Sequence, residues 1–164
     1  IPVRDELLHA KSYMNIQKVR YKNKFQITFD VDSDILDCCI VKLILQPILE
    51  NAINYGVREM DDCGEIIVQG RKEEDEILFT IADNGMGIPE EEIEFLLTDT
   101  QRVHKKGSGV GLVNVNNRIK ILFGEKYGLH IESELDEGTT ATIIIPKLEE
   151  TAEINSDESN KTKL

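Results

Sequence analysis

Basic residues, cysteines and long apolar runs are all scarce in this sequence. Nineteen lysines and arginines against 31 aspartates and glutamates give a net charge of −12, which argues against a nucleic-acid partner because phosphate backbones are bound by basic surfaces. The three cysteines, an adjacent pair at Cys38 and Cys39 and a single Cys63, provide neither a disulfide framework nor a zinc spacing and suit a reducing cytosol. No apolar run approaches the roughly 20 residues that span a bilayer. No signal peptide is present, and the chain begins at Ile1 rather than Met, so we expect a piece of a longer protein.

The 164 residues, 40% of them hydrophobic, are enough for one globular domain with a core. The first half predicts a helix over 3–20 and a strand over 25–31. The helix has a buried stripe of Val3, Leu7, Ala10, Met14 (or Tyr13) and Gln17, widened by Leu8, Ile16 and Val19. Ser33 and Asp34 are expected to cap a long buried helix ending near Gly56. Pro47 interrupts that helix and should kink it, unless the helix begins close by.

The second half alternates hairpins and helices. A first hairpin is expected of strands 65–71 and 77–82, followed by a short helix over 89–97 and a mobile loop over 98–106. A helix over 109–123 comes next, with one face formed by Leu112, Val115, Ile119 and Leu122. A second hairpin is expected of strands 129–135 and 139–145. From Lys147 onward the chain is polar and expected to be disordered. This order predicts an α/β (α+β) two-layer sandwich, in which helices cover one face of a mixed, mostly antiparallel sheet.

Three short segments carry the chemistry, and the first is Glu50-Asn51-Ala52-Ile53-Asn54-Tyr55-Gly56. Asn51, Asn54 and Tyr55 share one helix face, which we expect to lie outside the core because buried carboxamides need partners. An Asn carbonyl oxygen suits Mg²⁺, and Glu50 can accept hydrogen bonds from metal-bound water. An ordinary polar outer face explains this segment equally well when it is taken alone.

The second segment, Asp83-Asn84-Gly85-Met86-Gly87-Ile88-Pro89, follows a predicted strand. A carboxylate at a strand end can accept a hydrogen bond from the exocyclic N6 amino group of adenine. Gly85 and Gly87 permit positive φ and let the backbone approach a flat ring. Taken alone, a plain Asp-Asn-Gly turn is the better explanation.

The third segment, Gly107-Ser108-Gly109-Val110-Gly111-Leu112, opens a helix. Free N–H groups at a glycine-rich helix N-terminus form an anion cradle, here for the β- and γ-phosphates of a nucleotide. Lys105 and Lys106 add positive charge immediately before it. The segment follows no strand and lacks Gly-Lys-Ser/Thr, so it is neither a dinucleotide-binding fingerprint nor a Walker A loop.

Together and in this order, the segments resemble the N box and the two glycine boxes of GHKL-type ATPases, whose fold is called the Bergerat fold. Gly138-Thr139 resembles the threonine that completes the adenine–water network of that superfamily. Within it, Leu45-Gln46-Pro47-Ile48-Leu49-Glu50-Asn51-Ala52 and the helix from Gly111 to Phe123 are similar to sensor histidine kinases of the YesM/LytS-like class. The segment from Glu6 to Tyr21 resembles the linker that precedes the ATPase domain of that class.

The resemblance implies ATP and Mg as cofactors, with Glu50 and Asn51 catalytic and Asn51 the Mg²⁺ ligand. It implies that Asp83 contacts adenine N6, that Tyr55 packs on the adenine and that Gly109 and Gly111 lie at the phosphates. The candidate nucleotide-binding residues are Asn54, Tyr55, Asp83, Gly85, Gly87, Ile88, Lys105, Lys106, Gly107, Ser108, Gly109, Val110, Gly111, Leu112 and Thr139. It also implies a division into a linker-like helix (1–23), an ATP-binding domain (24–147) and a tail (148–164).

Some residues depart from the family pattern. Many histidine kinases carry Lys or Arg at the position of Asn54, and no clear phenylalanine box precedes the lid, although Phe95-Leu96-Leu97 is a loose substitute. Hydrolytic members place a general-base Glu where this chain has Pro47, which favours phosphoryl transfer to a protein acceptor over hydrolysis. None of the three histidines, His9, His104 and His130, has the acceptor context, so the acceptor is expected on an absent dimerisation domain.

The expected function is therefore the cytoplasmic catalytic domain of a two-component sensor histidine kinase. The resemblance implies a membrane-anchored homodimer as the full-length protein and a response regulator as its downstream partner. Two alternatives stay open: an anti-sigma-factor-type serine kinase of the same fold, and a degenerate interaction module without catalysis. ATP binding separates the module from the kinases, and a histidine in a helix upstream of Ile1 separates the two kinases.

Overall fold

The computed structural model describes residues 1–149 apart from 23, 58–59, 61–63 and 94–108. The elements, in chain order, are α1 (Val3–Arg20), β1 (Phe25–Val31), the 3-10 turn η1 (Ser33–Ile35), β2 (Cys38–Cys39), α2 (Leu45–Ala52), the π-helical turn η2 (Ile53–Val57), β3 (Gly64–Glu73), β4 (Glu76–Asp83), α5 (Gly109–Phe123), β5 (Gly128–Glu134), β6 (Gly138–Pro146) and β7 (Leu148–Glu149). A helix also begins at Glu90 and is described as far as Ile93. No described helix is long and apolar enough to cross a membrane.

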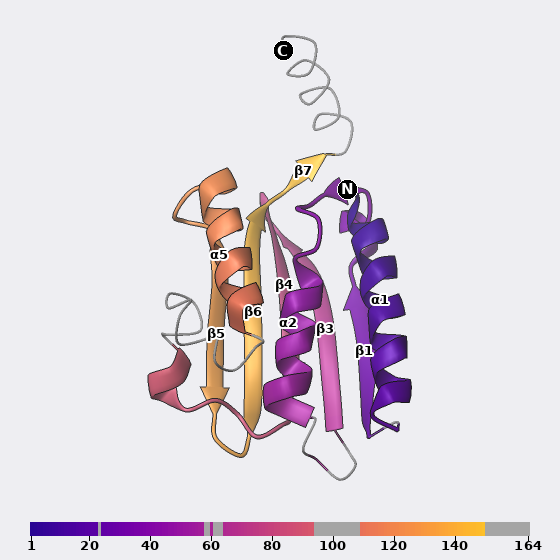
Figure 1. Cartoon of the computed structure of the whole chain (residues 1–164). Helices are drawn as coiled ribbons and strands as arrows, with labels where there is room; N and C mark the ends of the chain where they lie inside the picture. Colours follow the sequence, from indigo (N-terminus) through magenta and orange to yellow (C-terminus); the bar gives the residue numbers. More distant parts are fainter. Residues whose placement is uncertain (23, 58–59, 61–63, 94–108, 150–164) are drawn as a thin grey trace.

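Five strands form one sheet in the order β1-β3-β4-β6-β5. Strands β1 and β3 run parallel, and the other three pairs are antiparallel. Helices α1, α2 and α5 lie on one side of this sheet (Figure 1). The predicted mixed, mostly antiparallel two-layer sandwich is confirmed, and β2 and β7 add a small second sheet at one end.

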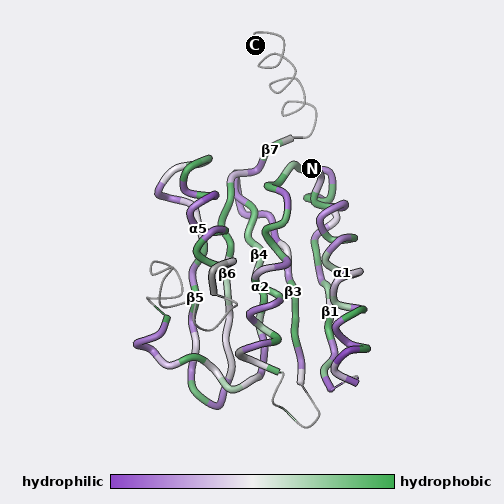
Figure 2. The backbone as a smooth tube through the Cα atoms, viewed as in Figure 1, coloured by the Kyte–Doolittle hydropathy of each residue, from purple (hydrophilic) through white to green (hydrophobic). Residues whose placement is uncertain are grey.

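The core lies between the helices and the covered face of the sheet. In β3, β4 and β6 every second residue is buried, so one face of each strand is apolar. The three central strands supply to the core Ile66, Val68, Ile77, Phe79, Ile81, Ala141, Ile143 and Ile145. Figure 2 shows the matching hydrophobic colour along these strands and the helices that face them.

Helix α1 has the predicted bounds, and its predicted stripe is buried from Val3 to Gln17. The residues predicted to widen that stripe are not buried: Leu8 and Ile16 are each 66% exposed and Val19 is 77% exposed. One narrow face of α1 meets the sheet and α2, and these three side chains project beyond it. The helix also shares the core of the domain, and the division of the chain at residue 23 stays a prediction.

The prediction of one long helix from Ser33 to Gly56 is wrong. Ser33 begins the short turn η1, a β-strand follows, and α2 begins only at Leu45. Leu43 has a positive φ of 61°, which prevents a continuous helix across it. Pro47 is therefore the third residue of α2, where its missing N–H has no intrahelical partner to lose, and no kink is needed.

A buried carboxylate on α1 forms the N-terminal cap of α2. Glu6 is 2% exposed, and its Oε1 accepts a hydrogen bond from the Leu43 N–H at 3.0 Å. Its Oε2 accepts from the Ile44 N–H at 2.8 Å and the Leu45 N–H at 3.0 Å. These donors have no partners inside the helix, and a negative charge suits the positive end of the helix dipole. Helix α1 thus fixes where α2 begins.

Two further predictions need correction. Leu122 was expected on the buried face of α5 with Val115 and Ile119, but it is 60% exposed. Leu148 and Glu149 were expected in a disordered tail, but they form β7, which pairs with Cys39 and Cys38 of β2. The remaining tail, 150–164, and the whole of the predicted loop over 98–106 lie outside the described residues.

Candidate functional site

The C-terminal ends of α2 and β4 and the β5–β6 turn lie at one end of the molecule, and α5 begins beside α2 (Figure 1). These elements carry the candidate residues that the structure describes. The helix of α2 continues past Ala52 as the π-helical turn η2. Such turns occur often at functional sites, because they rotate side chains out of the regular helical register.

Asn51 lies near the end of α2 and is 3% exposed. Its side-chain Oδ1 is buried and has no hydrogen-bond partner among the described residues. Leaving such an oxygen unsatisfied costs about 1–3 kcal/mol, so a ligand is the natural partner. A neutral oxygen of this kind is a ligand that Mg²⁺ accepts, and the site fits the cation.

Asn54 is exposed, unlike Asn51. The expectation that both lie on one face outside the core is therefore wrong for Asn51. The change to π geometry at Ile53 explains the difference, because the wider turn rotates residue 54 away from the direction that residue 51 takes. Glu50 is half-buried. The side chain of Tyr55 lies outside the described residues.

Asp83 ends β4 and is paired there with Ile66 of β3 and Thr139 of β6. Its Oδ1 accepts a hydrogen bond from the Gly85 N–H at 2.9 Å, and the backbone N–H of Thr139 also donates to the carboxylate. Burial raises the pKa of Asp83 to about 6, although both hydrogen bonds act in the opposite direction. A partly desolvated carboxylate of this kind is typical of a binding site.

The two glycines after Asp83 have different roles. Gly87 has a φ of +80°, as expected. No positive φ is found at Gly85, where a Cβ would come within 2.1–2.3 Å of the Gly56 backbone. Gly85 thus does not use the positive φ that glycine permits: the residue is small so that the end of η2 can pack on the segment after β4.

A cavity of about 400 Å³ opens beside Asp83. It is lined by Asp83, Glu132, Ser133, Glu134, Glu137, Gly138, Thr139 and Thr140. Ser133 organises its wall: its Oγ accepts from the Ile88 N–H at 2.7 Å, donates to the Gly138 carbonyl at 3.0 Å and lies 2.7 Å from Thr139 Oγ1. The sequence predicted Thr139 but missed Ser133, which is its cross-strand partner in the β5–β6 pairing.

Ile88, Gly111 and Leu112 were predicted to contact the nucleotide. Ile88 is 1% exposed and Leu112 is fully buried, and both belong to the apolar core. At Gly111 a Cβ would come 2.9 Å from the Pro47 Cβ, so the missing side chain lets α5 pack against α2. Phosphate contact by this helix N-terminus stays a prediction. Outside the described residues lie Lys105, Lys106, Gly107, Ser108 and the surroundings of Gly109 and Val110.

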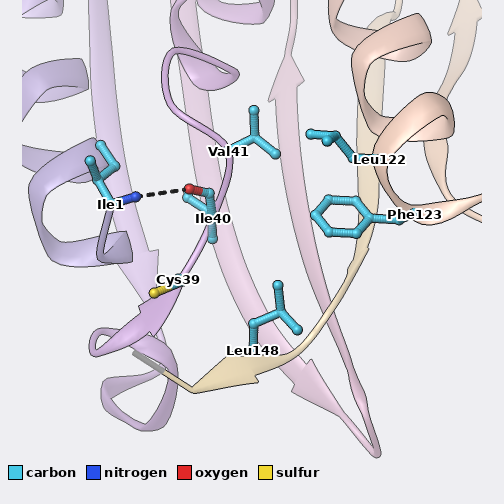
Figure 3. A pocket seen from close by; sticks show the side chains of 7 residues that line it. All are labelled: Ile1, Cys39, Ile40, Val41, Leu122, Phe123 and Leu148. Atoms are coloured by element: carbon cyan, nitrogen blue, oxygen red, sulfur yellow. Dashed lines mark hydrogen bonds between the residues drawn. The ribbon is translucent and has the colours of Figure 1, made fainter. Parts of the chain in front are cut away.

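A second cavity, of about 350 Å³, is drawn in Figure 3. It lies beside the N-terminus and β7, at the end of the molecule opposite the β5–β6 turn (Figure 1). Its lining is mostly apolar and comprises Ile1, Cys39, Ile40, Val41, Leu122, Phe123 and Leu148. The N-terminal ammonium of Ile1 donates to the Ile40 carbonyl at 3.2 Å beside it. None of the predicted site residues lines this cavity, so the Asp83 cavity is the candidate site.

Comparison with known proteins decides the family. Residues 40–149 match the family described as "Histidine kinase-, DNA gyrase B-, and HSP90-like ATPase". The chain belongs to this family. Membership implies ATP binding, and the matched residues include Asn51, Asp83 and Thr139. The resemblance seen in the sequence motifs is thereby confirmed.

Relatives within this ATPase family include sensor kinases. The chain is 35% identical to Sensor protein LytS of Bacillus cereus over 147 residues, which cover 90% of this chain and 25% of that protein. It is also 35% identical to Sensor histidine kinase YesM of Bacillus subtilis over 146 residues, which cover 89% of this chain and 24% of that protein. The chain thus spans about a quarter of the length of these curated relatives.

Solved structures confirm the fold of the family. The nucleotide-free catalytic domain of histidine kinase ThkA superposes with a TM-score of 0.71 at 18% identity, covering 90% of this chain and 93% of that one. Full-length ShkA in complex with AMPPNP gives a TM-score of 0.69 at 17% identity, covering 91% of this chain and 31% of that one. At these identities the likeness concerns the fold alone.

Proposed function

We propose that this chain is the ATP·Mg²⁺-binding catalytic domain of a two-component sensor histidine kinase, and that it donates the γ-phosphate to a histidine on a dimerisation domain outside this sequence. Family membership and the 35% identity to named sensor kinases support the proposal. The observation that carries it is the buried Oδ1 of Asn51, which has no partner among the described residues. It lies on the helix whose far end packs against Asp83.

Among the described residues, one group binds the adenine of ATP and another binds the Mg²⁺ ion. Asp83, in its ionised form, accepts a hydrogen bond from the adenine N6 amino group, and the Thr139 hydroxyl contributes to the polar wall beside it. Asn51 holds Mg²⁺ through Oδ1, and Glu50 accepts hydrogen bonds from metal-bound water. When bound, Mg²⁺ neutralises phosphate charge and helps to align the group that is transferred.

The surroundings of Pro47 support transfer rather than hydrolysis. Pro47 lies one helical turn before Asn51, where hydrolytic members of the superfamily carry a general-base glutamate. Its ring packs against Gly111 of α5, so an apolar contact occupies the position where those members carry the glutamate. No carboxylate at this position can activate a water molecule for attack on the γ-phosphate. The phosphoryl group is instead kept for the acceptor histidine.

Calorimetric titration of the chain with ATP, in MgCl₂ and in EDTA, tests the binding step. We expect Mg²⁺-dependent binding that Asp83→Asn weakens at least tenfold, since a carboxylate hydrogen bond is worth about 1.5–3 kcal/mol. Asn51→Ala should remove the Mg²⁺ dependence. Absence of binding at millimolar ATP contradicts the proposal.

The transfer step needs a longer form that contains the upstream helices, in which γ-labelled ATP should yield an acid-labile phosphohistidine.

We further propose that the full-length protein is a membrane-anchored homodimer that passes the phosphoryl group to a response regulator. The names of the LytS and YesM relatives as sensor proteins support this assignment. The chain covers only a quarter of their length, which leaves room for sensing and dimerisation segments. Transfer of the label from the phosphorylated longer form to a purified receiver domain tests it.

A further inference from the structure

Ser133, Thr139 and Asp83 lie side by side on three neighbouring strands. Thr139 of β6 pairs directly with Ser133 of β5 on one side and with Asp83 of β4 on the other. Side chains that are directly opposite each other in an antiparallel pair lie on the same face of the sheet. All three residues line the cavity of about 400 Å³. Thr139 therefore lies between the carboxylate of Asp83 and the hydroxyl group of Ser133.

The Ser133 hydroxyl has three polar neighbours and only one proton. Its Oγ accepts a hydrogen bond from the Ile88 N–H at 2.7 Å, and this backbone group can only donate. The Gly138 carbonyl oxygen, 3.0 Å from Oγ, can only accept. Thr139 Oγ1, at 2.7 Å, can do either. A hydroxyl group offers one O–H donor and two acceptor lone pairs, so the other two neighbours decide the direction of the Ser133–Thr139 hydrogen bond.

Only one direction satisfies all three neighbours. When Ser133 donates to the Gly138 carbonyl, Thr139 donates to Ser133, and the two lone pairs of Ser133 Oγ are taken by Thr139 and the Ile88 N–H. In the reverse direction Ser133 gives its proton to Thr139, and two acceptor oxygens then face each other at 3.0 Å with no proton between them. Leaving acceptors unmatched in a partly buried network costs free energy.

We propose that Ser133 is a positioning residue, which takes up the hydroxyl proton of Thr139 so that Thr139 Oγ1 presents only acceptor lone pairs to the nucleotide and, beside Asp83, selects the exocyclic amino group of adenine. This inference rests on the proposed function. Ser133 has neither a proton nor a lone pair left for a ligand, so it acts through Thr139.

The chemistry of the base explains why the direction of this hydrogen bond matters. The exocyclic amino group of adenine has two N–H donors, and ionised Asp83 accepts one of them. Thr139 Oγ1 accepts the other, directly or through a bridging water molecule. Thr139 is only 5% exposed, so an unmatched donor here would cost more than it does in bulk water. A threonine hydroxyl without Ser133 is free to rotate and donate, and it would lose its preference for an amino group.

The test compares two nucleotides that differ only in this group. Calorimetry in MgCl₂ at about pH 8, where Asp83 is ionised, measures the dissociation constants of ATP and of purine riboside 5′-triphosphate, which lacks the 6-amino group. The amino preference is the ratio of the second constant to the first. It is measured for the wild type, Ser133→Ala, Ser133→Thr, Thr139→Val and the Ser133→Ala/Thr139→Val double variant. Thr142→Val is the control, because it removes a hydroxyl group from a half-buried position of β6 outside the cavity.

We expect Ser133→Ala to lower the amino preference about three- to tenfold, which is the effect of losing one neutral hydrogen bond. Ser133→Thr restores the hydroxyl group and should restore the preference, and Thr142→Val should match the wild type. Because Ser133 acts through Thr139, the double variant should have the same preference as Thr139→Val alone. Thermal unfolding checks that each variant is folded, and Ser133→Cys, a weak donor of similar shape, replaces Ser133→Ala if the alanine variant is not.

A merely structural role for Ser133 gives a different result. Loss of the Ile88 contact alone would weaken both nucleotides by the same factor and leave their ratio unchanged, and that outcome overturns the inference. A further fall of the ratio when Ser133→Ala is added to Thr139→Val also overturns it. A wild type that binds both nucleotides equally overturns the inference while ATP binding itself stands. Absence of ATP binding by the wild type contradicts the proposed function instead.

Discussion

The backbone of Gly56 lies directly against the carboxylate of Asp83, so closely that a Cβ on residue 56 would come within 2.6 Å of Asp83 Oδ1. The end of η2 thus forms one wall of the place where the adenine is expected to bind. Gly85 closes the same contact from the other side, against the Gly56 backbone. Two of the three sequence motifs therefore meet through their glycines.

We predict that Gly56→Ala weakens ATP binding at least tenfold and destabilises the fold by about 1–3 kcal/mol, the usual range for an overpacked site. The added methyl group must displace the Asp83 side chain, which is the group that recognises adenine. Calorimetry and urea unfolding measure the two effects. Gly124→Ala is the control, because residue 124 has a positive φ but no atom within 4 Å of a Cβ. It should lose stability and keep ATP affinity, and the same loss of affinity in both variants would contradict the prediction.

The raised pKa of Asp83 predicts that ATP binding depends on pH. With a pKa of about 6 in the folded protein, the carboxylate is mostly ionised at pH 7 and mostly protonated at pH 5. A protonated carboxyl has lost its acceptor charge for the adenine amino group. Affinity should therefore fall about tenfold from pH 7 to pH 5. Calorimetry across this pH range measures the ATP affinity. Asp83→Asn is the control, because its weak binding should not follow this pH dependence.

The same pKa sets the sign of a stability effect. The ordinary pKa of the group is 3.8, and burial raises it in the folded state. The folded protein therefore binds the proton more tightly than the unfolded chain does, and protonation stabilises the fold. This contribution is fully present below pH 3.8 and is lost as pH rises through about 6. Asp83→Asn should remove that loss from the unfolding free energy of the nucleotide-free protein.

The sheet, α1, α5 and the position of Asp83 could be predicted from the sequence because each depends on local periodicity. The start of α2 could not. Its cap, Glu6, lies 39 residues before Leu45, and no local pattern shows that pairing. Leu8, Ile16 and Val19 looked like core residues for a related reason: apolar spacing shows a face but not how wide the contact is.

The candidate site shows the same limit. The sequence motifs identified Asp83 and Thr139 as site residues. Ser133 belongs to no motif, and only the β5–β6 pairing places it against Thr139. The burial of Asn51 also escaped prediction, since a regular helix would have kept it level with the exposed Asn54. Long-range pairing and the π-helical turn decided these positions, and neither can be read from neighbouring residues.

Glu6→Gln should destabilise the protein by about 1–3 kcal/mol, because the amide that replaces one carboxylate oxygen cannot accept, and the charge that favours the helix N-terminus is lost. Urea unfolding with an unchanged m-value measures this effect. Asp5→Asn is the matched control: it removes the same charge from the exposed neighbouring residue, which makes no such cap. Equal destabilisation by both variants would show that net charge, and not the cap of α2, is the cause.

The buried Oδ1 of Asn51 destabilises the nucleotide-free protein, since it has no partner among the described residues. Asn51→Leu replaces it with an apolar group of similar size, which leaves no polar atom unsatisfied and fits the apolar neighbours Ile48 and Ala52 on α2.

We therefore expect Asn51→Leu to be as stable as the wild type or more stable, by up to about 2 kcal/mol, in urea unfolding without nucleotide. The same variant should lose the extra stability that Mg²⁺·ATP confers on the wild type. Asn117→Leu, an Asn-to-Leu change at an exposed position of α5, should alter neither quantity. A clear destabilisation of the nucleotide-free Asn51→Leu protein would mean that the role of Asn51 is to support the fold and not to bind a cation. The opposite signs expected with and without Mg²⁺·ATP thus distinguish a binding residue from a structural one.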